Sequence, residues 1–361
     1  MKKIVMIFAA LIISLPWGRI WAEQLVITGS TTVQPIAVKI AESYKATHKA
    51  IDIKIVGGGS GNGIKAIIDG TTDIGNTSRF IKKKELKYAH GKGVYPVPFQ
   101  IAYDCIIPIV NPENKIKTLT IEQLRSIYIG SVNNWKEVSD MDRPIIVISR
   151  DTSSGTYEIW EKKIMDGQGV FPGAQLAASN KDVLKKVTSK KNAIGYIGLG
   201  YLESGVKPIQ ISKIDGTVKT ALDGTYPLSR PLFMFTRGWP NGETLKFINY
   251  VLNPATGQKA VKACGFVALY ETETCIEPKQ LMFHSDPNYI AEIPANIQMV
   301  QQYLKVLGYQ VGVVDGIKGG KTISAMIAFQ KQNNLTLEWK ISNKMISLLS
   351  DQYLHSISTK Q

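Results

Sequence analysis

Short apolar runs alternate with amphipathic stretches over the first part of the chain. Residues 25–28 and 51–56 have the β-branched composition of strands, while residues 35–48 and 61–69 carry apolar side chains at helical spacing. The order strand, helix, strand, helix is typical of a doubly wound α/β sheet. In such a sheet ligands bind outside the carboxyl ends of the strands. We therefore expect an α/β fold with its binding site at that edge.

The same alternation continues toward the middle of the chain. Residues 101–110 and 145–149 are predicted strands, and residues 121–128 between them form a predicted helix. A further helix is predicted over residues 155–165, directly after a Ser-Ser-Gly turn. Its N-terminus, the positive end of the helix dipole, would then face that turn.

The C-terminal part has a purely helical pattern. Residues 281–294 contain two prolines and little periodicity, which indicates a linker. Helical spacing of apolar residues follows over residues 297–307 and 322–329. A turn segment with the pattern GYxxGxxDGxxGxxT joins these two predicted helices. The pattern predicts a small separate domain.

The amino end has the pattern of a secretory signal peptide. Lys2 and Lys3 precede an apolar run over residues 4–15, and the small residue Ala22 follows at the expected cleavage point. That run is short for a membrane span, and no later segment reaches about 18 apolar residues without charges. We expect residues 1–22 to be removed and the mature protein to be exported to the periplasm. The absence of a cysteine at this point argues against a lipid anchor.

Charge and cysteine content narrow the partner classes. The chain has a formal net charge of +14, but its lysines are scattered and accompany no nucleic-acid-binding motif, so nucleic acid is not an expected partner.

Cys105 lies in an apolar strand pattern and is expected to be buried. Cys264 and Cys275 would either form a disulfide across a short loop or remain free thiols.

Four loop segments combine glycines with hydroxyl side chains. They cover residues 29–35, 57–63, 73–79 and 149–158, and the last two also contain an arginine. Glycines let backbone N–H groups approach an anion closely, and a serine or threonine at a helix start adds a hydroxyl donor. An arginine supplies a fork of donors for two oxygens of a tetrahedral anion. The four segments together predict a site for a small oxyanion.

Six motifs carry a resemblance to a known family. GSTTVQP, VGGGSGNGIKAIIDGTTDIGNTSR, TLTIEQLRSIYIGSVNNWKEV, SRDTSSGTYE, AIGYIGLGYL and YPLSRPLFMFT occur in this order. This set resembles the PstS-type phosphate-binding proteins of phosphate ABC transporters over about residues 24–275. The resemblance implies a two-lobed periplasmic-binding-protein fold of the hinge-closing type II. It also implies a binding domain over residues 23–280, with residues 23–102 and 229–280 in the first lobe and residues 103–228 in the second.

The resemblance places several residues at the phosphate. Thr31 and Thr32 fall in its first phosphate loop, and Ser60 falls in the second. The remaining positions match the family's arginine and the helix start that follows it: Arg150, Ser154, Gly155 and Thr156. Several neutral donors and one fixed cation are the chemistry that replaces the hydration shell of a dianion. Ser154 has the alternative role of a simple helix cap.

One position departs from the family pattern. Some members carry an aspartate that accepts a hydrogen bond from the protonated phosphate, and here that position reads Ser78, followed by Arg79. Both are assigned to the site by the resemblance. Asp104, which interrupts an apolar strand, is the candidate replacement acceptor. The alternative is an aspartate paired with buried backbone or with Arg79, which would leave the discrimination between phosphate and sulfate without an explanation.

The C-terminal segment resembles the peptidoglycan-binding-like three-helix module of many cell-wall enzymes. The likeness covers residues 295–350, with residues 351–361 as a tail, and places Asp315 and Gly316 in the conserved turn. The core positions it implies are Val300, Leu304, Leu307, Ile323, Met326 and Phe329. A departure is LEWKISNK before the third helix, with Trp339 and Lys340 where a glycine-rich turn is usual. Wall binding and a structural or protein-binding role both stay open.

The combined prediction is an exported receptor that captures inorganic phosphate and delivers it to an ABC transporter permease, held at the cell wall by its C-terminal domain. It is expected to act as a monomer, without a cofactor and without a metal, since the four histidines form no metal-binding spacing. It is not expected to be an enzyme. A wall-associated phosphate-ester hydrolase is the alternative, but the SSGT segment lacks the GxSxG elbow. A phosphate-sensing or adhesion protein without a permease is the second alternative.

Overall fold

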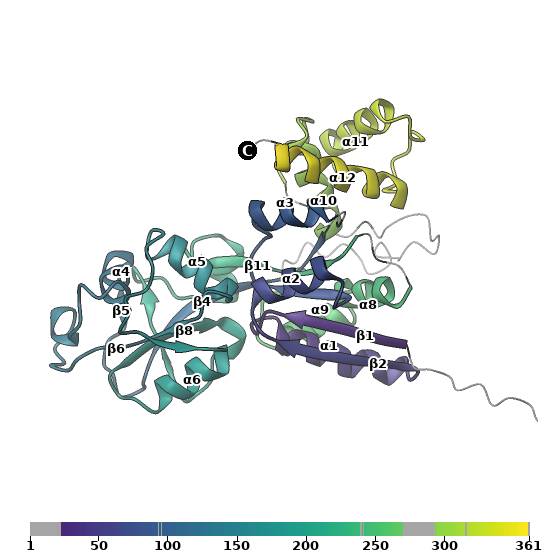
Figure 1. Cartoon of the computed structure of the whole chain (residues 1–361). Coiled ribbons are helices and arrows are strands. Elements are labelled where there is room, and N and C mark those ends of the chain that lie inside the picture. The colour runs from purple at the N-terminus through teal and green to yellow at the C-terminus, as the bar shows by residue number, and fades with distance from the viewer. Residues whose placement is uncertain are drawn as a thin grey trace, which may run out of the picture.

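The computed structural model describes residues 23–92, 94, 96–238, 240, 242–269, 292, 294–314 and 316–359 (Figure 1). The predicted signal peptide, Cys275, Asp315 and nearly all of the predicted linker lie outside the described residues.

The strands follow the short β-branched runs of the sequence. Their bounds are β1 (Glu23–Gly29), β2 (Ile51–Gly57), β3 (Ile74–Thr77), β4 (Val97–Val110), β5 (Thr118–Leu119), β6 (Ile146–Arg150), β7 (Gln175–Ala177), β8 (Ala193–Gly198), β9 (Lys207–Pro208), β10 (Gln210–Ile211) and β11 (Ser229–Thr236). Strand β8 is buried along its whole length, which explains why its sequence AIGYIG does not alternate between polar and apolar residues.

The helices occupy the amphipathic stretches. Their bounds are α1 (Gln34–Thr47), α2 (Ser60–Asp69), α3 (Lys83–Gly91), α4 (Ile121–Tyr128), α5 (Gly155–Lys163), α6 (Asn180–Thr188), α7 (Val218–Leu222), α8 (Gly242–Leu252), α9 (Gly257–Ala263), α10 (Pro294–Val306), α11 (Gly320–Gln332) and α12 (Asn343–Thr359). Two short 3₁₀ helices cover Trp135–Glu137 and Leu199–Tyr201. Helix α4 begins where predicted because Thr120 and Gln123 form a reciprocal capping box.

One mixed sheet runs through both lobes. Its order is β2-β1-β3-β11-β4-β8-β6-β7, with β9 also paired to β4. Strands β1, β2 and β3 pair in parallel, whereas β11 pairs antiparallel with β3 and with β4. The long strand β4 and its partner β11 thus join the two lobes, which Figure 1 shows side by side. The predicted two-lobed α/β fold is confirmed, with an antiparallel return strand that the sequence pattern did not indicate.

Two separate apolar cores support the two lobes. One core contains Ala102 of β4 and Leu232 of β11, and the other contains Cys105 and Leu228. The change from one core to the other therefore falls within a few residues on both connecting strands. Cys105 is fully buried, as predicted, and burial raises the pKa of its thiol to about 12. A hinge between the lobes would bend at these strands.

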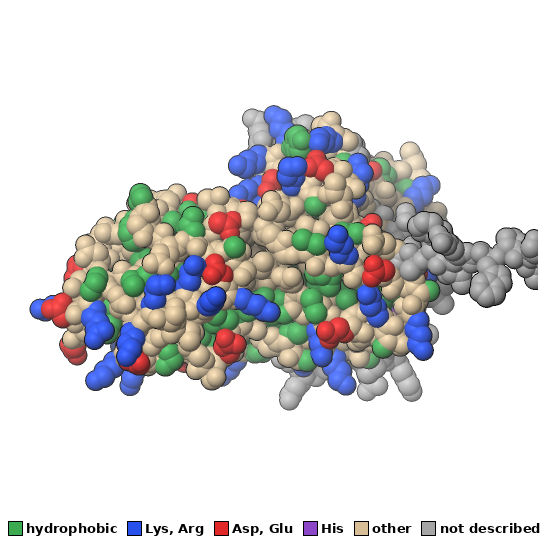
Figure 2. All heavy atoms as spheres, turned by 60° about the horizontal axis from the view of Figure 1, so that its bottom comes forward, with side chains coloured by type: hydrophobic (Ala, Val, Ile, Leu, Met, Phe, Trp, Pro, Cys, Tyr) green, Lys and Arg blue, Asp and Glu red, His purple; other side chains and the backbone are tan. Residues whose placement is uncertain are grey.

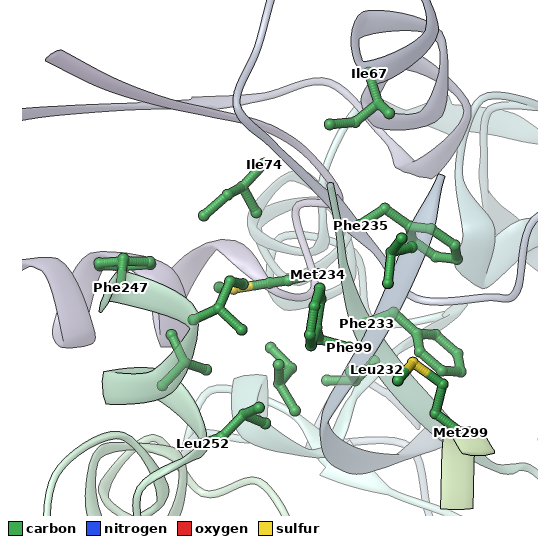
Figure 3. Close-up of a cluster of buried hydrophobic side chains, with 14 of the residues drawn as sticks. Ile67, Ile74, Phe99, Leu232, Phe233, Met234, Phe235, Phe247, Leu252 and Met299 are labelled. Atoms are coloured by element: carbon green, nitrogen blue, oxygen red, sulfur yellow. The ribbon is translucent and has the colours of Figure 1, made fainter. Parts of the chain in front are cut away.

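The C-terminal helices form a small bundle that packs on the first lobe. Helix α12 lies beside α3, and α10 lies against β4 (Figure 1). Met299 of α10 reaches the aromatic cluster of the first lobe beside Phe233 (Figure 3). The apolar residues of this bundle are thus continuous with the core of the first lobe.

The predicted core of the C-terminal bundle is nearly correct. Four of its positions are buried, namely Val300, Leu304, Met326 and Phe329. Leu307 is partly buried against the core, and Ile323 is half-buried while its neighbour Thr322 takes the buried position. Helix α12 also continues well past residue 350, where the sequence analysis ended the domain, because Tyr353 is buried and stacks on Tyr303.

Within the described part of the chain, no helix combines the length and hydropathy needed to cross a membrane. The same residues hold no cluster of three or more His, Cys, Asp or Glu side chains that could bind a metal ion.

Candidate functional site

Loops from both lobes meet at the carboxyl ends of β1, β3 and β6. The first lobe contributes Thr31 and Thr32 after β1, Ser60 at the start of α2 and Ser78 after β3. The second lobe contributes the start of α5, which begins at Gly155. Every one of these side chains is buried. The four loop segments singled out in the sequence therefore come together in space.

We call the place where these loops meet, lined by Thr31, Thr32, Ser60, Ser78 and the start of α5, the cradle. Hydroxyl groups of the two lobes are in direct contact there. Thr32 Oγ1 lies 3.1 Å from Thr156 Oγ1, which joins the first lobe to the second. Ser60 Oγ accepts a hydrogen bond from the Ser78 backbone N–H at 2.9 Å. A Cβ atom on Gly155 would lie 2.4 Å from Ser60 Oγ and 2.8 Å from Ser78 Oγ. The close approach of the lobes therefore requires glycine at this position.

Ser154 has the helix-capping role that the sequence left open. Its Oγ accepts from the backbone N–H groups of Thr156 at 3.2 Å and Tyr157 at 3.3 Å. Capping orders the first turn of α5 and directs the positive end of its dipole at the cradle. Ser154 thus shapes the helix start that faces the cradle.

Arg150 ends β6 with a guanidinium group that is largely committed to backbone carbonyls. Its Nε donates to Ala177 O and one terminal nitrogen to Ala178 O, both at 3.0 Å. The other terminal nitrogen, Nη1, is buried and has no hydrogen-bond partner among the described residues. Burial lowers the pKa of Arg150. A buried donor without a partner costs free energy unless a ligand accepts from it.

A second arginine at the cradle, Arg230 of β11, was missed in the sequence. Its Nη2 donates to Thr156 Oγ1 at 3.0 Å and lies 3.5 Å from Thr32 Oγ1, while Nη1 donates to Ser78 O at 3.2 Å. Arg230 is buried, and burial lowers its pKa. The sequence did contain a signal for Arg230, because a charged residue inside an apolar run such as SRPLFMF needs a buried partner. The same argument selected Asp104 as a candidate.

Asp104 lies at the cradle, but its carboxylate is already engaged. Its Oδ2 accepts from Arg230 Nε at 3.1 Å and Nη2 at 2.8 Å, and its Oδ1 accepts from the Leu199 N–H at 2.8 Å. The antiparallel register of β4 and β11 sets Arg230 opposite Asp104. Burial raises the pKa of the Asp104 carboxyl, against the lowering influence of Arg230. The alternative of a paired aspartate is therefore the one observed, with Arg230 rather than Arg79 as partner.

The assignment of Arg79 to the anion site requires correction. Its guanidinium pairs with Glu85 at 2.6 Å and with Glu158 at 2.7 Å, so its donors face two carboxylates instead of the cradle. Burial lowers the pKa of Arg79, but these carboxylates outweigh burial and the pKa is raised. Glu158 belongs to α5 of the second lobe and also pairs with Lys82 at 2.7 Å. Arg79 is thus part of an ion-pair latch between the lobes, formed by Arg79, Lys82 and Glu158.

Asn180 is a second residue that the sequence analysis did not find. It begins α6 in the second lobe, and its Nδ2 donates to Thr32 Oγ1 at 3.1 Å across the lobe boundary. Its Oδ1 accepts from the Gly198 N–H at 3.2 Å. An asparagine after a serine N-cap is common in ordinary helices, so no local signal distinguished it.

Family models match both parts of the chain. A model described as a PBP superfamily domain matches residues 22–255, and a model of a peptidoglycan binding domain matches residues 294–337.

Curated relatives share the first of these parts. A phosphate-binding protein PstS from Staphylococcus epidermidis is 35% identical over an alignment of 254 residues that covers 66% of this chain and 77% of the relative. A phosphate-binding protein PstS from Bacillus subtilis is 29% identical over 244 residues, covering 67% of this chain and 80% of the relative.

Solved structures are similar over the same region. A phosphate ABC transporter substrate-binding protein from Clostridium perfringens, solved with bound phosphate, has a TM-score of 0.64 and 30% identity, covering 68% of this chain and all of that chain (100%). An ABC-type phosphate transport receptor from Vibrio cholerae has a TM-score of 0.55 and 31% identity over 67% of this chain and 99% of the other.

Proposed function

This chain belongs to the PstS family of phosphate-binding proteins within the PBP superfamily, and from that premise we propose that it captures inorganic phosphate between its lobes and delivers it to an ABC transporter permease. The observation that supports this most directly is Arg150 Nη1, a buried donor for which the described residues offer no hydrogen-bond partner, on the arginine that ends β6. Phosphate would accept from this donor, from the start of α5 and from the hydroxyls of Thr32, Ser60 and Thr156.

Closure of the lobes would trap the anion. Thr32 contacts Thr156, and Gly61 N donates to Ser153 O at 3.1 Å, so both lobes contribute to the same cradle. An anion that accepts hydrogen bonds from both lobes binds the closed arrangement better than an open one. Affinity and closure are then thermodynamically linked.

Phosphate binding is expected to be saturable and one-to-one in a calorimetric titration of the mature chain, after bound ligand has been removed by unfolding and refolding. Competition by sulfate in the same buffer measures how strongly the site discriminates between the two anions. No heat of binding with either anion would overturn the proposal. Asp104→Asn then tests selectivity: improved sulfate competition would assign the discrimination to this carboxylate, and unchanged competition would leave Asp104 as the residue that orients Arg230.

Loss of the latch is expected to weaken phosphate binding by about three- to tenfold, because Glu158→Gln removes two ion pairs that favour closure. The dissociation rate of phosphate, measured by stopped-flow fluorescence, should rise by the same factor. Glu161→Gln is the matched control, since Glu161 lies on the same helix and accepts from Tyr157 OH within the same lobe. Equal dissociation rates in both variants would contradict the latch.

The C-terminal bundle is proposed to bind peptidoglycan and so to keep the receptor at the cell wall, in the periplasm, as a monomer. The match of residues 294–337 to a peptidoglycan binding domain supports this. Holding the receptor near its transporter raises the effective concentration without a membrane anchor. Hydrolysis is not part of the proposal, because the relatives are binding proteins and Ser154 Oγ serves as a helix cap. Release of nitrophenol from a chromogenic phosphate ester would contradict that view.

A further inference from the structure

The three most exposed large apolar side chains of the described residues belong to the C-terminal bundle. Val313 is 73% exposed, Trp339 is 72% exposed and Ile317 is 68% exposed, and Leu337 of the same bundle is 55% exposed. All four belong to the two loops that flank α11. Folded proteins rarely leave such a group of apolar side chains in water unless the surface binds something.

These two loops are held next to each other. Lys318, from the loop before α11, donates from Nζ to the backbone oxygen of Trp339 at 2.9 Å. Lys318 also pairs with Glu292, which precedes α10. The loop that carries Ile317 is fixed to α10, since Gln301 Nε2 donates to Ile317 O at 3.0 Å and Gly316 N donates to Gln301 Oε1 at 2.9 Å. The apolar side chains are therefore presented by an ordered backbone.

Positive charge accompanies this apolar group. Residues 294–359 contain six lysines and three acidic residues. Lys321 lies beside the first loop, because a Cβ on Gly312 would be 3.2 Å from Lys321 Cδ. Figure 2 shows several blue side chains, with fewer red ones among them, over the end of the molecule formed by this bundle, at the top of the view. We call the surface formed by Ile317, Lys321 and Trp339 the tryptophan surface.

We propose that the tryptophan surface is the peptidoglycan contact of this bundle, with the indole of Trp339 against a sugar ring and Lys321 at a carboxylate of the peptide stem. This inference rests on the proposed wall binding and assigns its residues. The C–H face of a pyranose is apolar and flat, and it matches an exposed indole that costs little side-chain entropy to hold. The stem peptides carry free carboxylates, which complement the lysine excess of the bundle.

Co-sedimentation with purified peptidoglycan sacculi tests the proposal. The mature chain is expected to pellet with the sacculi. Trp339→Ala is expected to lower the apparent affinity for the sacculi at least tenfold. Trp339→Phe should retain most of the binding, because an aromatic face remains. The matched control is Leu176→Ala, which removes an exposed apolar side chain from the second lobe and should bind as the unmodified chain does.

A spectroscopic arm reports on the indole itself. Trp135 and Trp160 are fully buried, and Trp239 lies outside the described residues. A fluorescence change on adding muramidase-solubilised muropeptides is expected, and the part of it that vanishes in Trp339→Ala reports on Trp339. Phosphate titration and thermal unfolding should be the same in all variants, since Trp339 is exposed and distant from the cradle in sequence and domain.

The outcomes separate this inference from the function on which it rests. If the unmodified chain does not pellet with sacculi, the proposed wall binding fails and the tryptophan surface fails with it. If the unmodified chain pellets and Trp339→Ala pellets equally well, wall binding stands and the tryptophan surface is wrong. Selective loss in Trp339→Ala, with Trp339→Phe retained, supports both.

Discussion

Replacement of Arg150 by alanine is expected to weaken phosphate binding by at least about 100-fold, or about 3 kcal/mol. The reason is the geometry of the guanidinium group. Carbonyls of Ala177 and Ala178 hold it in place, and Nη1 remains as a buried donor without a hydrogen-bond partner among the described residues, which the proposed anion would supply. Alanine removes the donor and the cation at once, and the desolvated anion loses its strongest partner. Calorimetric titration with phosphate measures the effect.

Two further variants make this result specific. Arg150→Lys keeps the positive charge but cannot donate to both carbonyls and to the anion, so it should recover only a small part of the affinity. Arg143→Ala removes an exposed arginine from the same lobe and should bind phosphate normally. Far-ultraviolet circular dichroism confirms that each variant is folded. If folded Arg150→Ala binds phosphate with an affinity within threefold of that of the unmodified chain, the proposed role of Arg150 is wrong.

Replacement of Arg230 by methionine is expected to destabilise the protein by about 3–5 kcal/mol at neutral pH. Methionine fills a similar length but leaves the Asp104 carboxylate buried, with only the Leu199 N–H donating to it among the contacts described above. An uncompensated buried charge is among the costliest changes available to a single substitution. Urea unfolding monitored by circular dichroism gives the free energy of unfolding.

The loss should depend on pH in a defined direction. Burial raises the pKa of the Asp104 carboxyl, and removal of Arg230 removes the largest influence that lowers it. In Arg230→Met the folded state therefore favours the protonated carboxyl more than the unfolded state does. The variant should lose stability as the pH rises from the ordinary carboxyl pKa through the raised folded-state pKa, and regain it as the pH falls.

A double variant isolates the pair. Asp104→Asn combined with Arg230→Met removes both charges, so it should recover most of the stability that Arg230→Met loses. It should also abolish the pH dependence that the single variant adds. If the double variant is as unstable as the single one at neutral pH, the cost lies in packing and the buried charge is not its cause.

Local patterns in the sequence were enough to predict the strands and helices that carry most of the cradle and the chemistry of its loops, but not the return strand β11. Residues 121–128 formed the predicted helix because its capping box is local, and residues 25–28 and 51–56 formed strands because alternation and β-branching act over a few neighbours. The hydroxyl residues Thr32 and Ser60, each in a segment with glycines, predicted the position of the cradle, since that chemistry can be recognised in a short segment. These properties depend on nearest neighbours in the chain.

Which charged groups line the cradle depended on contacts between segments that are distant in the chain. Arg79 follows β3 and Arg230 lies inside β11, and although the apolar run around Arg230 indicated a buried partner, neither local sequence identified that partner. The antiparallel register of β11 on β4 sets Arg230 against Asp104, whereas the approach of α5 from the second lobe gives Arg79 a carboxylate at Glu158. Partners more than fifty residues apart are chosen by strand pairing and lobe contact. A one-residue change in the register of β11 would turn Arg230 to the other face of the sheet, away from Asp104.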